Sequence, residues 1–363
     1  MSTSPASRPG TSDPAGDPAG DPAGDPAGDP AGDPAGDPAG DPIGERVTDV
    51  LGDPWTAETL DLGHDDEGPV VATLVHRRAP QPTRRAVLYV HGFSDYFFQV
   101  DFAAWWLERG YDFYALDLRK YGRSLRDGQT PAFVTDVAEY GAELGQAWAR
   151  ITERDGHEHV IGAAHSTGGL VLPLWLDQAR PAELAGLVLN SPWLDMQGSV
   201  WLRTVGTVAI DQLGARRPRF EIKRAVDGFY TEALHRDHHG EWDFDLDWKP
   251  AESMKVYAGW LRAIRRGHAR VHRGLDVGAP VLVLSSDRSS HPTSFDDDLV
   301  STDVVLDVRQ IRRWASSLST QVTYTAVPGA IHDVVLSRRP VRERAYAEID
   351  RWHEAYVLAD APA

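Results

Sequence analysis

Hydrophobic positions follow two periods that alternate along most of the chain. Short apolar runs rich in β-branched and aromatic residues predict strands at 56–62, 69–78, 86–93, 111–119, 159–166, 185–194, 279–286 and 321–330. Between them, apolar residues spaced three and four apart predict helices at 100–110, 133–151, 168–179, 307–318 and 341–358. The first two strands are expected to pair antiparallel. The alternation of strand and helix after them predicts an α/β fold, with a mainly parallel central sheet flanked by helices.

One stretch of about 80 residues interrupts this alternation. It spans roughly 196–275, shows little strand pattern and is rich in Trp, Tyr, His and Arg. The functional groups of such a sheet lie at the carboxyl ends of its strands. An insertion between two strands at that edge is therefore expected to cover them as a cap. The core is then expected in two parts, 45–195 and 276–363, with the cap 196–275 inserted between them.

The N-terminal segment 1–44 has a different composition. Residues 13–40 are seven consecutive copies of Asp-Pro-Ala-Gly, and 41–44 form a degenerate further copy. Proline breaks regular structure, glycine adds conformational freedom, and nothing in the perfect copies is more apolar than alanine. Burial cannot offset the ordering entropy of such a segment, so we predict a disordered tail. Its role is either to increase solubility or to dock on another surface, and the sequence leaves both alternatives open.

Charge and composition narrow the classes of function. The 363 residues carry a formal net charge of −17, and the seven repeat copies contribute one aspartate each. This acidic balance argues against nucleic acid or an anionic membrane as the main partner, and 262–273 is the candidate for a local basic patch. The lack of cysteine excludes disulfides and thiolate metal sites. With no signal peptide and no apolar stretch of roughly 18 residues, we expect a cytoplasmic protein without an integral membrane segment.

The stretch AAHSTGGL at 163–170 places a serine between a predicted strand and a predicted helix. Ser166 has small residues two positions away on either side, Ala164 and Gly168, as the close passage of strand and helix backbones requires. A serine at such a turn lifts its hydroxyl above the sheet, beside the positive end of the helix. These features favour a nucleophile. A helix N-cap is the alternative interpretation, because serine is common at that position.

A general base and an acid are expected after Ser166. His332 follows the last predicted strand in a short loop that contains glycine, and the order serine, acid, histidine favours it as the base. Two aspartates follow the strand 279–286. Asp303 directly precedes the next predicted helix and is the favoured acid, and Asp287, immediately after the strand, is the alternative acid.

The end of the strand 86–93 completes the predicted site. The strand stops at the segment His91-Gly92-Phe93. The backbone N–H of Phe93 and that of Thr167 are expected to form an oxyanion hole. Donors that point at a developing oxyanion lower the barrier by roughly 3–4 kcal/mol each.

Taken together, the motifs YVHGFSDY, LDLRKYGRS, AAHSTGGL, LNSPWLD and PGAIHDVVLS resemble the α/β-hydrolases. The similarity is greatest to the branch that holds monoacylglycerol lipases, lysophospholipases and serine aminopeptidases, and it covers about 45–360. The resemblance implies the nucleophile at Ser166, the base at His332, and oxyanion donors at Phe93 and Thr167. The chain departs from the family pattern at Ala164, where glycine is usual, and in a long insert before Asp303.

The resemblance also implies a serine hydrolase that transfers an acyl group to water, with no cofactor and no metal. The expected substrate is a small or lipid-like carboxylic ester. An aminopeptidase or amidase of the same fold is one alternative, and a non-catalytic binding protein is another. His235, His238 and His239 match no metal-ligand spacing, so hydrogen bonding within the cap is expected for them.

Aromatic residues in and beside the cap are candidates for an acyl-binding surface. They are Trp193, Trp201, Tyr230, Trp242 and Trp248. A role in the core of the cap is the alternative, because buried aromatic residues more often serve packing.

Deletion of residues 1–44 is expected to leave the melting temperature almost unchanged, because a segment that buries little apolar surface contributes little to stability. Calorimetry on the full and shortened chains tests this. A fall of several degrees would show that the segment docks on the folded part.

Overall fold

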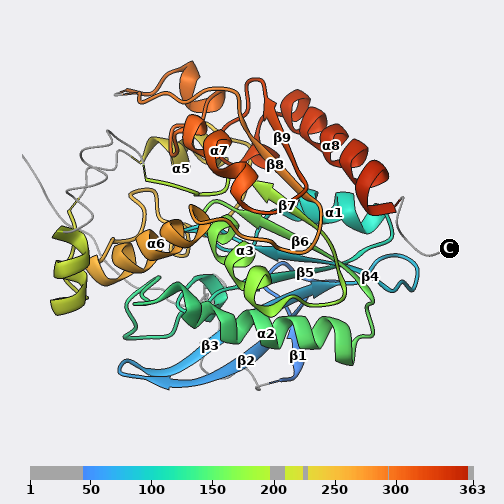
Figure 1. Ribbon diagram of the computed structural model, residues 1–363, viewed down its shortest axis with the longest axis horizontal. Coiled ribbons are helices and arrows are strands. Elements are labelled where there is room, and N and C mark those ends of the chain that lie inside the picture. Colours follow the sequence, from blue (N-terminus) through green and yellow to red (C-terminus); the bar gives the residue numbers. More distant parts are fainter. Residues whose placement is uncertain (1–43, 197–208, 224–227, 293, 359–363) are drawn as a thin grey trace, which may run out of the picture. The chain divides into compact units, whose positions relative to one another are not determined.

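The described residues form a central sheet of nine strands in the order β1-β2-β3-β5-β4-β6-β7-β8-β9 (Figure 1). The structure is a computed structural model that describes residues 44–196, 209–223, 228–292 and 294–358. The strands are β1 (Arg46–Thr48), β2 (Thr56–Asp65), β3 (Gly68–Arg77), β4 (Arg85–Val90), β5 (Asp112–Asp117), β6 (His159–His165), β7 (Leu184–Asn190), β8 (Val281–Ser286) and β9 (Val322–Val327). The pairs β1/β2, β2/β3 and β3/β5 are antiparallel, and all other pairs are parallel. The predicted fold class is therefore confirmed.

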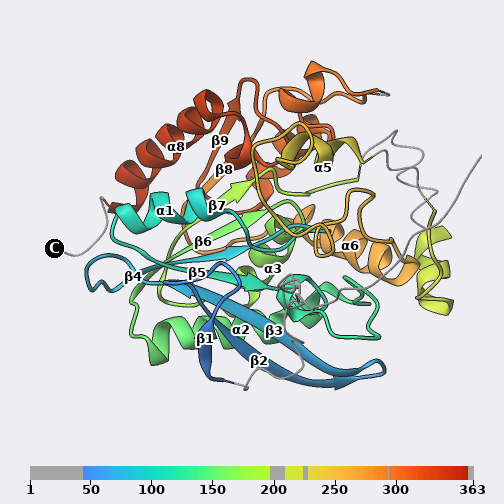
Figure 2. The same ribbon diagram turned by 180° about the vertical axis from the view of Figure 1, so that it is seen from behind.

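Helices flank both faces of the sheet, and two further helices belong to the cap. They are α1 (Val100–Glu108), α2 (Gly141–Ala149), α3 (Gly168–Ala179), α5 (Phe229–Leu234), α6 (Ala258–Val271), α7 (Val308–Trp314) and α8 (Arg339–His353). Helices α1 and α8 lie side by side in both views of the molecule (Figures 1 and 2). Between them the rings of Phe102 and Tyr346 stack with their centroids 6.3 Å apart. The guanidinium of Arg109 adds a two-pronged hydrogen bond to Asp350.

The helix predicted at 133–151 has a later start. A 3-10 turn begins at Val137, because the Asp136 carboxylate accepts the N–H of Ala138 while the Glu139 side chain accepts the N–H of Asp136. This capping box fixes where the chain can enter a helix. The last turn, Arg150–Arg154, is a π-helix.

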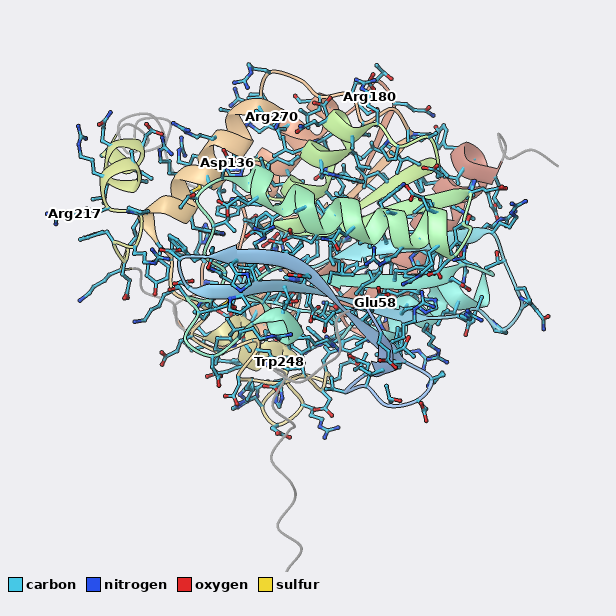
Figure 3. The ribbon with its side chains drawn as sticks, turned by 90° about the horizontal axis from the view of Figure 1, so that it is seen from below. Glu58, Asp136, Arg180, Arg217, Trp248 and Arg270 are labelled. Carbon is cyan, nitrogen blue, oxygen red and sulfur yellow. The ribbon has the colours of Figure 1, made fainter. Side chains whose placement is uncertain are left out.

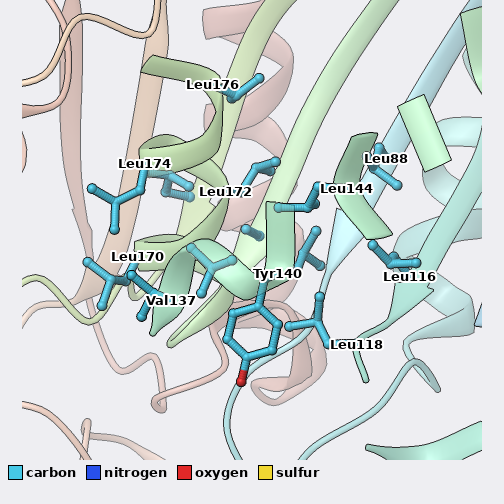
Figure 4. Close-up of a cluster of buried hydrophobic side chains, with 14 of the residues drawn as sticks. Leu88, Leu116, Leu118, Val137, Tyr140, Leu144, Leu170, Leu172, Leu174 and Leu176 are labelled. Carbon is cyan, nitrogen blue, oxygen red and sulfur yellow. The ribbon is translucent and has the colours of Figure 1, made fainter. Parts of the chain in front are cut away.

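Alternating side chains divide the core into two layers, one on each face of the sheet. In β4, Leu88 and Val90 face the layer built with α2 and α3, whereas Val87 and Tyr89 face the layer built with α1 and α8. Figure 4 shows the first layer, in which leucines of β4 and β5 meet those of α2 and α3. This twofold burial explains why the central strands read as continuous apolar runs.

The cap is more regular than the sequence predicted. The prediction of an irregular segment was wrong for α6, a helix of 14 residues whose buried face includes Trp260, Ile264 and Val271. Their spacing is helical, but arginines between them obscure it in the sequence. Residues 209–216 are also helical. Figure 1 shows α5 and α6 beyond the carboxyl ends of the central strands.

The arginines of the predicted basic patch on α6 are partly neutralised. Arg262 and Arg266 both pair with Asp211, and Arg270 lies 3.8 Å from the carboxylate of Asp177. Arg270 is labelled in Figure 3 with Arg180, which pairs with Asp276. Acidic residues therefore offset part of the positive charge on this face of α6.

Two expectations concern residues that the structure does not describe. The tail 1–44 lies outside the described residues except for Gly44, and Trp201 also lies outside them. Within the described part of the chain, no helix combines the length and the apolar character that crossing a membrane requires.

Candidate active site

Ser166 lies at the sharp turn between β6 and α3. Its φ of 50° is in the left-handed region, which is unusual for a residue with a side chain and costs on the order of 1–3 kcal/mol. Two backbone hydrogen bonds hold it there, from the Ser166 N–H to the Asn190 carbonyl (3.0 Å) and from the Trp193 N–H to the Ser166 carbonyl (2.9 Å). The N-cap position of α3 belongs to Thr167. The Ser166 hydroxyl is thus left for another partner.

Small residues around Ser166 are required by close backbone contacts. A Cβ atom on Gly168 would lie 2.4 Å from the His91 carbonyl oxygen, and one on Gly169 would lie 2.6 Å from Pro192 Cβ. Ala164 is buried in the core, where its methyl group is accommodated. The departure from the usual glycine at this position is therefore compatible with the turn.

His332 bridges Ser166 and Asp303. Its Nε2 lies 3.0 Å from Ser166 Oγ, and its Nδ1 lies 3.0 Å from Asp303 Oδ2. Both His332 and Asp303 are buried, and Ser166 is 7% exposed. The structure thus brings together the three residues that the sequence predicted as nucleophile, base and favoured acid.

Asp303 is held by the chain around it. Its Oδ1 accepts the N–H groups of Val305 and Leu306, at 2.9 and 2.7 Å. The insert that precedes it closes on itself, because Ser289 and Asp303 form a parallel bridge that returns the chain to the end of β8. The alternative acid, Asp287, is exposed and accepts the N–H of Gly329. Asp287 is therefore engaged outside the Ser166–His332 pair.

The end of β4 passes directly beside Ser166. A Cβ atom on Gly92 would lie 3.0 Å from Ser166 Cβ, so only glycine fits without displacement. The buried His91 fixes this loop, since its Nδ1–H donates to the Gly92 carbonyl (2.7 Å) and its Nε2 accepts the N–H of Leu118 (3.0 Å). Burial lowers the pKa of His91, which keeps the ring neutral in these roles. Both predicted oxyanion donors, Phe93 and Thr167, line the same cavity as Ser166.

That cavity has a volume of about 570 Å³, within the usual range for small-molecule sites. Its walls come from the loop after β4, the turn at Ser166, the cap and the insert before Asp303. Among the predicted aromatic residues, Trp193 and Tyr230 line it. Trp260 also lines it and contacts Phe93, with ring centroids 4.3 Å apart. The sequence reasoning missed Trp260 because α6 was not predicted.

Other predicted cap residues have structural partners. Trp242 and Trp248 pack in a separate aromatic cluster, where the Trp248 ring, labelled in Figure 3, lies edge-on to Tyr96. Trp242 Nε1 donates to the Leu336 carbonyl at 2.8 Å. Both ring nitrogens of His235 are occupied, by the Phe244 carbonyl and by the Asp237 N–H. Hydrogen bonding within the cap therefore accounts for the His235 ring.

A second group of buried charged residues, which the sequence reasoning missed, lies against this site. Asp95, His165 and Asp333 place one ligand atom each within 4.8 Å of one another, a spacing at which a cation could bind. Lys249 Nζ lies 3.0 Å from Asp95 Oδ1 and supplies a positive charge at that place. The ammonium group disfavours a metal ion there, because the two cations would repel each other.

The charges in this group stabilise one another. Burial alone would lower the pKa of His165, but the carboxylates of Asp333 and Asp95 outweigh it and raise the pKa. Burial likewise opposes ionisation of Asp95, but Lys249 and His165 hold its pKa well below the usual range. The only signal in the sequence was the presence of an ionisable residue beside each of two predicted catalytic residues, His165 before Ser166 and Asp333 after His332.

Comparison with known proteins finds a family match over most of the chain. Residues 81–338 match the family described as serine aminopeptidase, S33. A comparison with curated protein sequences finds no match.

Solved structures share the fold at low sequence identity. A soluble variant of monoglyceride lipase from Saccharomyces cerevisiae, in complex with a substrate analog, is 15% identical with a TM-score of 0.58, covering 82% of this chain and 96% of that one. The monoacylglycerol lipase of Paleococcus ferrophilus is 20% identical with a TM-score of 0.56, covering 77% and 97%. A carboxyl esterase from Bacillus coagulans, in complex with glycerol, is 12% identical with a TM-score of 0.59, covering 83% and 99%.

The substitution Gly168→Ala is expected to lower stability by roughly 3 kcal/mol, because the new methyl group would overlap two backbone carbonyl oxygens that cannot move aside. The matched control is Ala164→Gly, which removes a methyl group from the other side of the turn and should cost only about 1 kcal/mol. Thermal denaturation of both variants measures the difference. Equal losses would mean that the approach of α3 to β4 does not constrain the turn.

Proposed function

The chain belongs to the serine aminopeptidase S33 family and is a serine hydrolase of the α/β-hydrolase fold, and we propose that its substrate is a carboxylic ester with an apolar, small or lipid-like acyl group. Ser166, His332 and Asp303 are proposed as nucleophile, base and acid. The proposal is supported by their chain of hydrogen bonds at the wall of a largely apolar cavity.

The proposed reaction has two acyl-transfer steps. Ser166 Oγ attacks the ester carbonyl carbon while His332 Nε2 accepts the hydroxyl proton, and Asp303 stabilises the resulting imidazolium through Nδ1–H. The oxyanion is stabilised by the N–H groups of Phe93 and Thr167. His332 then protonates the leaving alcohol, which breaks the ester bond and leaves an acyl group on Ser166. Water, deprotonated by His332, releases the acid and restores the serine.

The walls of the cavity favour an ester over an aminopeptidase substrate. An aminopeptidase must hold the ammonium group of its substrate, which requires an anionic or strongly accepting partner. Among the described residues that line the cavity there is no Asp or Glu, and the only Lys or Arg is Lys249. This set of side chains offers no carboxylate to an ammonium group. It is the observation that carries the choice of ester.

The apolar walls suit an acyl group. They come from the core and the cap together and include Phe93, Trp193, Ile222, Val256, Trp260 and Leu306. The rings of Trp193 and Trp260 are 5.9 Å apart, so the two packed tryptophans present a continuous apolar surface near Ser166. The solved structures that share the fold include two monoacylglycerol (monoglyceride) lipases and a carboxyl esterase, which agrees with this proposal.

The description of the family supports aminopeptidase or amidase activity as a second candidate. The two activities use the same nucleophile and differ in what the cavity must hold. Aminoacyl p-nitroanilides, assayed beside p-nitrophenyl esters, therefore separate them. Preferred hydrolysis of the anilides would favour the second candidate.

Wild type and Ser166→Ala should differ by at least roughly 10³-fold in hydrolysis of p-nitrophenyl esters, because the variant lacks the nucleophile. A chain-length series from acetate upward should show one optimum, set by the apolar walls. Far-ultraviolet circular dichroism checks that the variant is folded. Activity retained in the variant would sink the mechanism, and a wild type inert to both esters and a fluorophosphonate probe would favour a non-catalytic binding protein.

Asp303→Asn should lower kcat by roughly 10⁴-fold, because an amide cannot stabilise the imidazolium and can present its NH₂ to Nδ1, which selects the wrong tautomer. The matched control is Asp287→Asn, at an exposed position whose carboxylate contacts Gly329, and it should stay within about twofold of wild type. Steady-state kinetics on the preferred ester measure both. The reverse order of effects would make Asp287 the acid.

A further inference from the structure

The buried charged residues Lys249, Asp95, His165 and Asp333 connect the cap to the segments that carry Ser166 and His332. We propose that they form a charge-balanced cluster through which the cap sets the electrostatic environment of His332, with Lys249 as a positioning residue. The proposal rests on the hydrolase mechanism above, and we call these four residues the charge cluster.

Each member of the charge cluster comes from a different part of the fold. Asp95 lies in the loop after β4, which also carries Phe93, and His165 ends β6 one residue before Ser166. Asp333 follows His332 after β9. Lys249 belongs to the cap. All four are at most 5% exposed, so their mutual contacts replace contacts with water.

The contacts within the charge cluster range from a hydrogen bond to a longer ion pair. Lys249 Nζ lies 3.0 Å from Asp95 Oδ1, and the other oxygen of Asp95 lies 3.4 Å from His165 Nδ1. The same nitrogen lies 3.8 Å from Asp333 Oδ2. Asp333 is also fixed by Asn190, whose Nδ2 donates to its Oδ1 at 2.6 Å. One His165 nitrogen therefore faces both carboxylates, while Lys249 neutralises one of them.

The cap makes a second contact at the same place. The backbone N–H of Asp333 donates to the hydroxyl of Tyr230 in α5, at 3.1 Å. The Tyr230 ring lies 5.8 Å from the His332 ring and 5.9 Å from Lys249 Nζ. The His165 ring also lies close to His332, with the two ring centroids 4.8 Å apart. His332 is thus enclosed by the charge cluster and by cap residues that contact it.

Charge counting shows what Lys249 contributes. Among the described residues, the titratable and charged groups near His332 and the cluster include Tyr89, His91, Asp95, His165, Tyr230, Lys249, Asp303 and Asp333. Asp117, which is paired with Arg123, lies near His91, and His291 lines the same cavity as His332. Burial raises the pKa of Tyr89 and Tyr230 and lowers that of His91, so these three are uncharged near neutral pH. With His165 protonated, as its raised pKa favours, the two positive and two negative charges of the cluster cancel.

Loss of the Lys249 charge leaves a net negative charge beside His332. A negative charge favours the protonated imidazolium, so a higher pH is needed to reach the neutral base that accepts the Ser166 proton. Lys249→Met should therefore move the acid limb of the kcat/KM profile to higher pH, by on the order of one pH unit. A contact that only supports the cap would lower activity without moving this limb.

The experiment measures the pH profile for ester hydrolysis and, in parallel, for the rate of Ser166 labelling by a fluorophosphonate probe. Lys249→Arg keeps the charge and should restore the wild-type limb. Lys249→Gln removes the charge but keeps a hydrogen-bond donor for Asp95, so it should shift the limb even if Lys249→Met does not fold. The double variant Lys249→Met with Asp95→Asn removes one charge of each sign and should return the limb towards the wild-type position.

The matched control is Arg109→Met, which removes the cation of another ion pair, that with Asp350 between α1 and α8. Helix α1 ends just before β5 begins, at the amino ends of the parallel strands, whereas Ser166 follows the carboxyl end of β6. The acid limb of the pH profile should therefore not move in this variant.

Two outcomes would overturn the proposal. One is a folded Lys249→Gln variant whose acid limb stays at the wild-type pH, and the other is a double variant whose acid limb moves further than that of Lys249→Met. Labelling without ester hydrolysis would reject the ester substrate alone, since the labelling profile still tests the cluster. A Ser166 inert to both reagents would overturn both proposals.

Discussion

The left-handed backbone of Ser166 is the constraint on which the rest of the site depends. It lets β6 end and α3 begin within two residues, and it places the hydroxyl above the sheet rather than along the helix. The strain is tolerated because hydrogen bonds to the last residue of β7 and to Trp193 beyond it hold Ser166 through its N–H and its carbonyl. The same turn draws the β4 loop so close that glycine is required at 168 and is the residue that fits at 92 without displacing Ser166. One unusual φ angle thereby positions both the proposed nucleophile and the proposed oxyanion donors.

The contact between His332 and Asp303 depends on a second feature, the way in which the insert after β8 folds back on itself. The proposed acid, Asp303, is 17 residues beyond the end of β8 in sequence, which by itself would leave it in a long loop. The bridge between Ser289 and Asp303 cancels that separation, and the N–H groups of Val305 and Leu306 orient the carboxylate. The insert then has a second role, because His291 and Leu299 line the cavity beside the cap. A loop that would otherwise loosen the site therefore helps to enclose it.

The cap and the core share charge as well as apolar surface. The apolar walls around Trp260 bring the cap over Ser166, and Lys249 reaches from the cap to a carboxylate in the core. Burying that ammonium group is costly unless it meets an opposite charge, so the ion pair specifies one position of the cap relative to Asp95. The same inserted segment thus contributes both to the apolar walls of the cavity and to the charge near His332.

The sequence alone determined the local features of this protein. Runs such as 86–93 and 159–166 specified strands, and the small residues around Ser166 specified the turn, because these features depend on neighbours within a few positions. The order of Ser166, Asp303 and His332 along the chain also indicated their predicted roles.

Only the tertiary structure decided between Asp303 and Asp287 as the partner of His332, because the bridge at Ser289 depends on a contact between distant positions. The charge cluster likewise joins four segments spread from Asp95 to Asp333, and periodicity carries no information about which charged residues meet. The helix α6 was missed for a related reason: its arginines mask an apolar face that becomes evident only when it packs on the core.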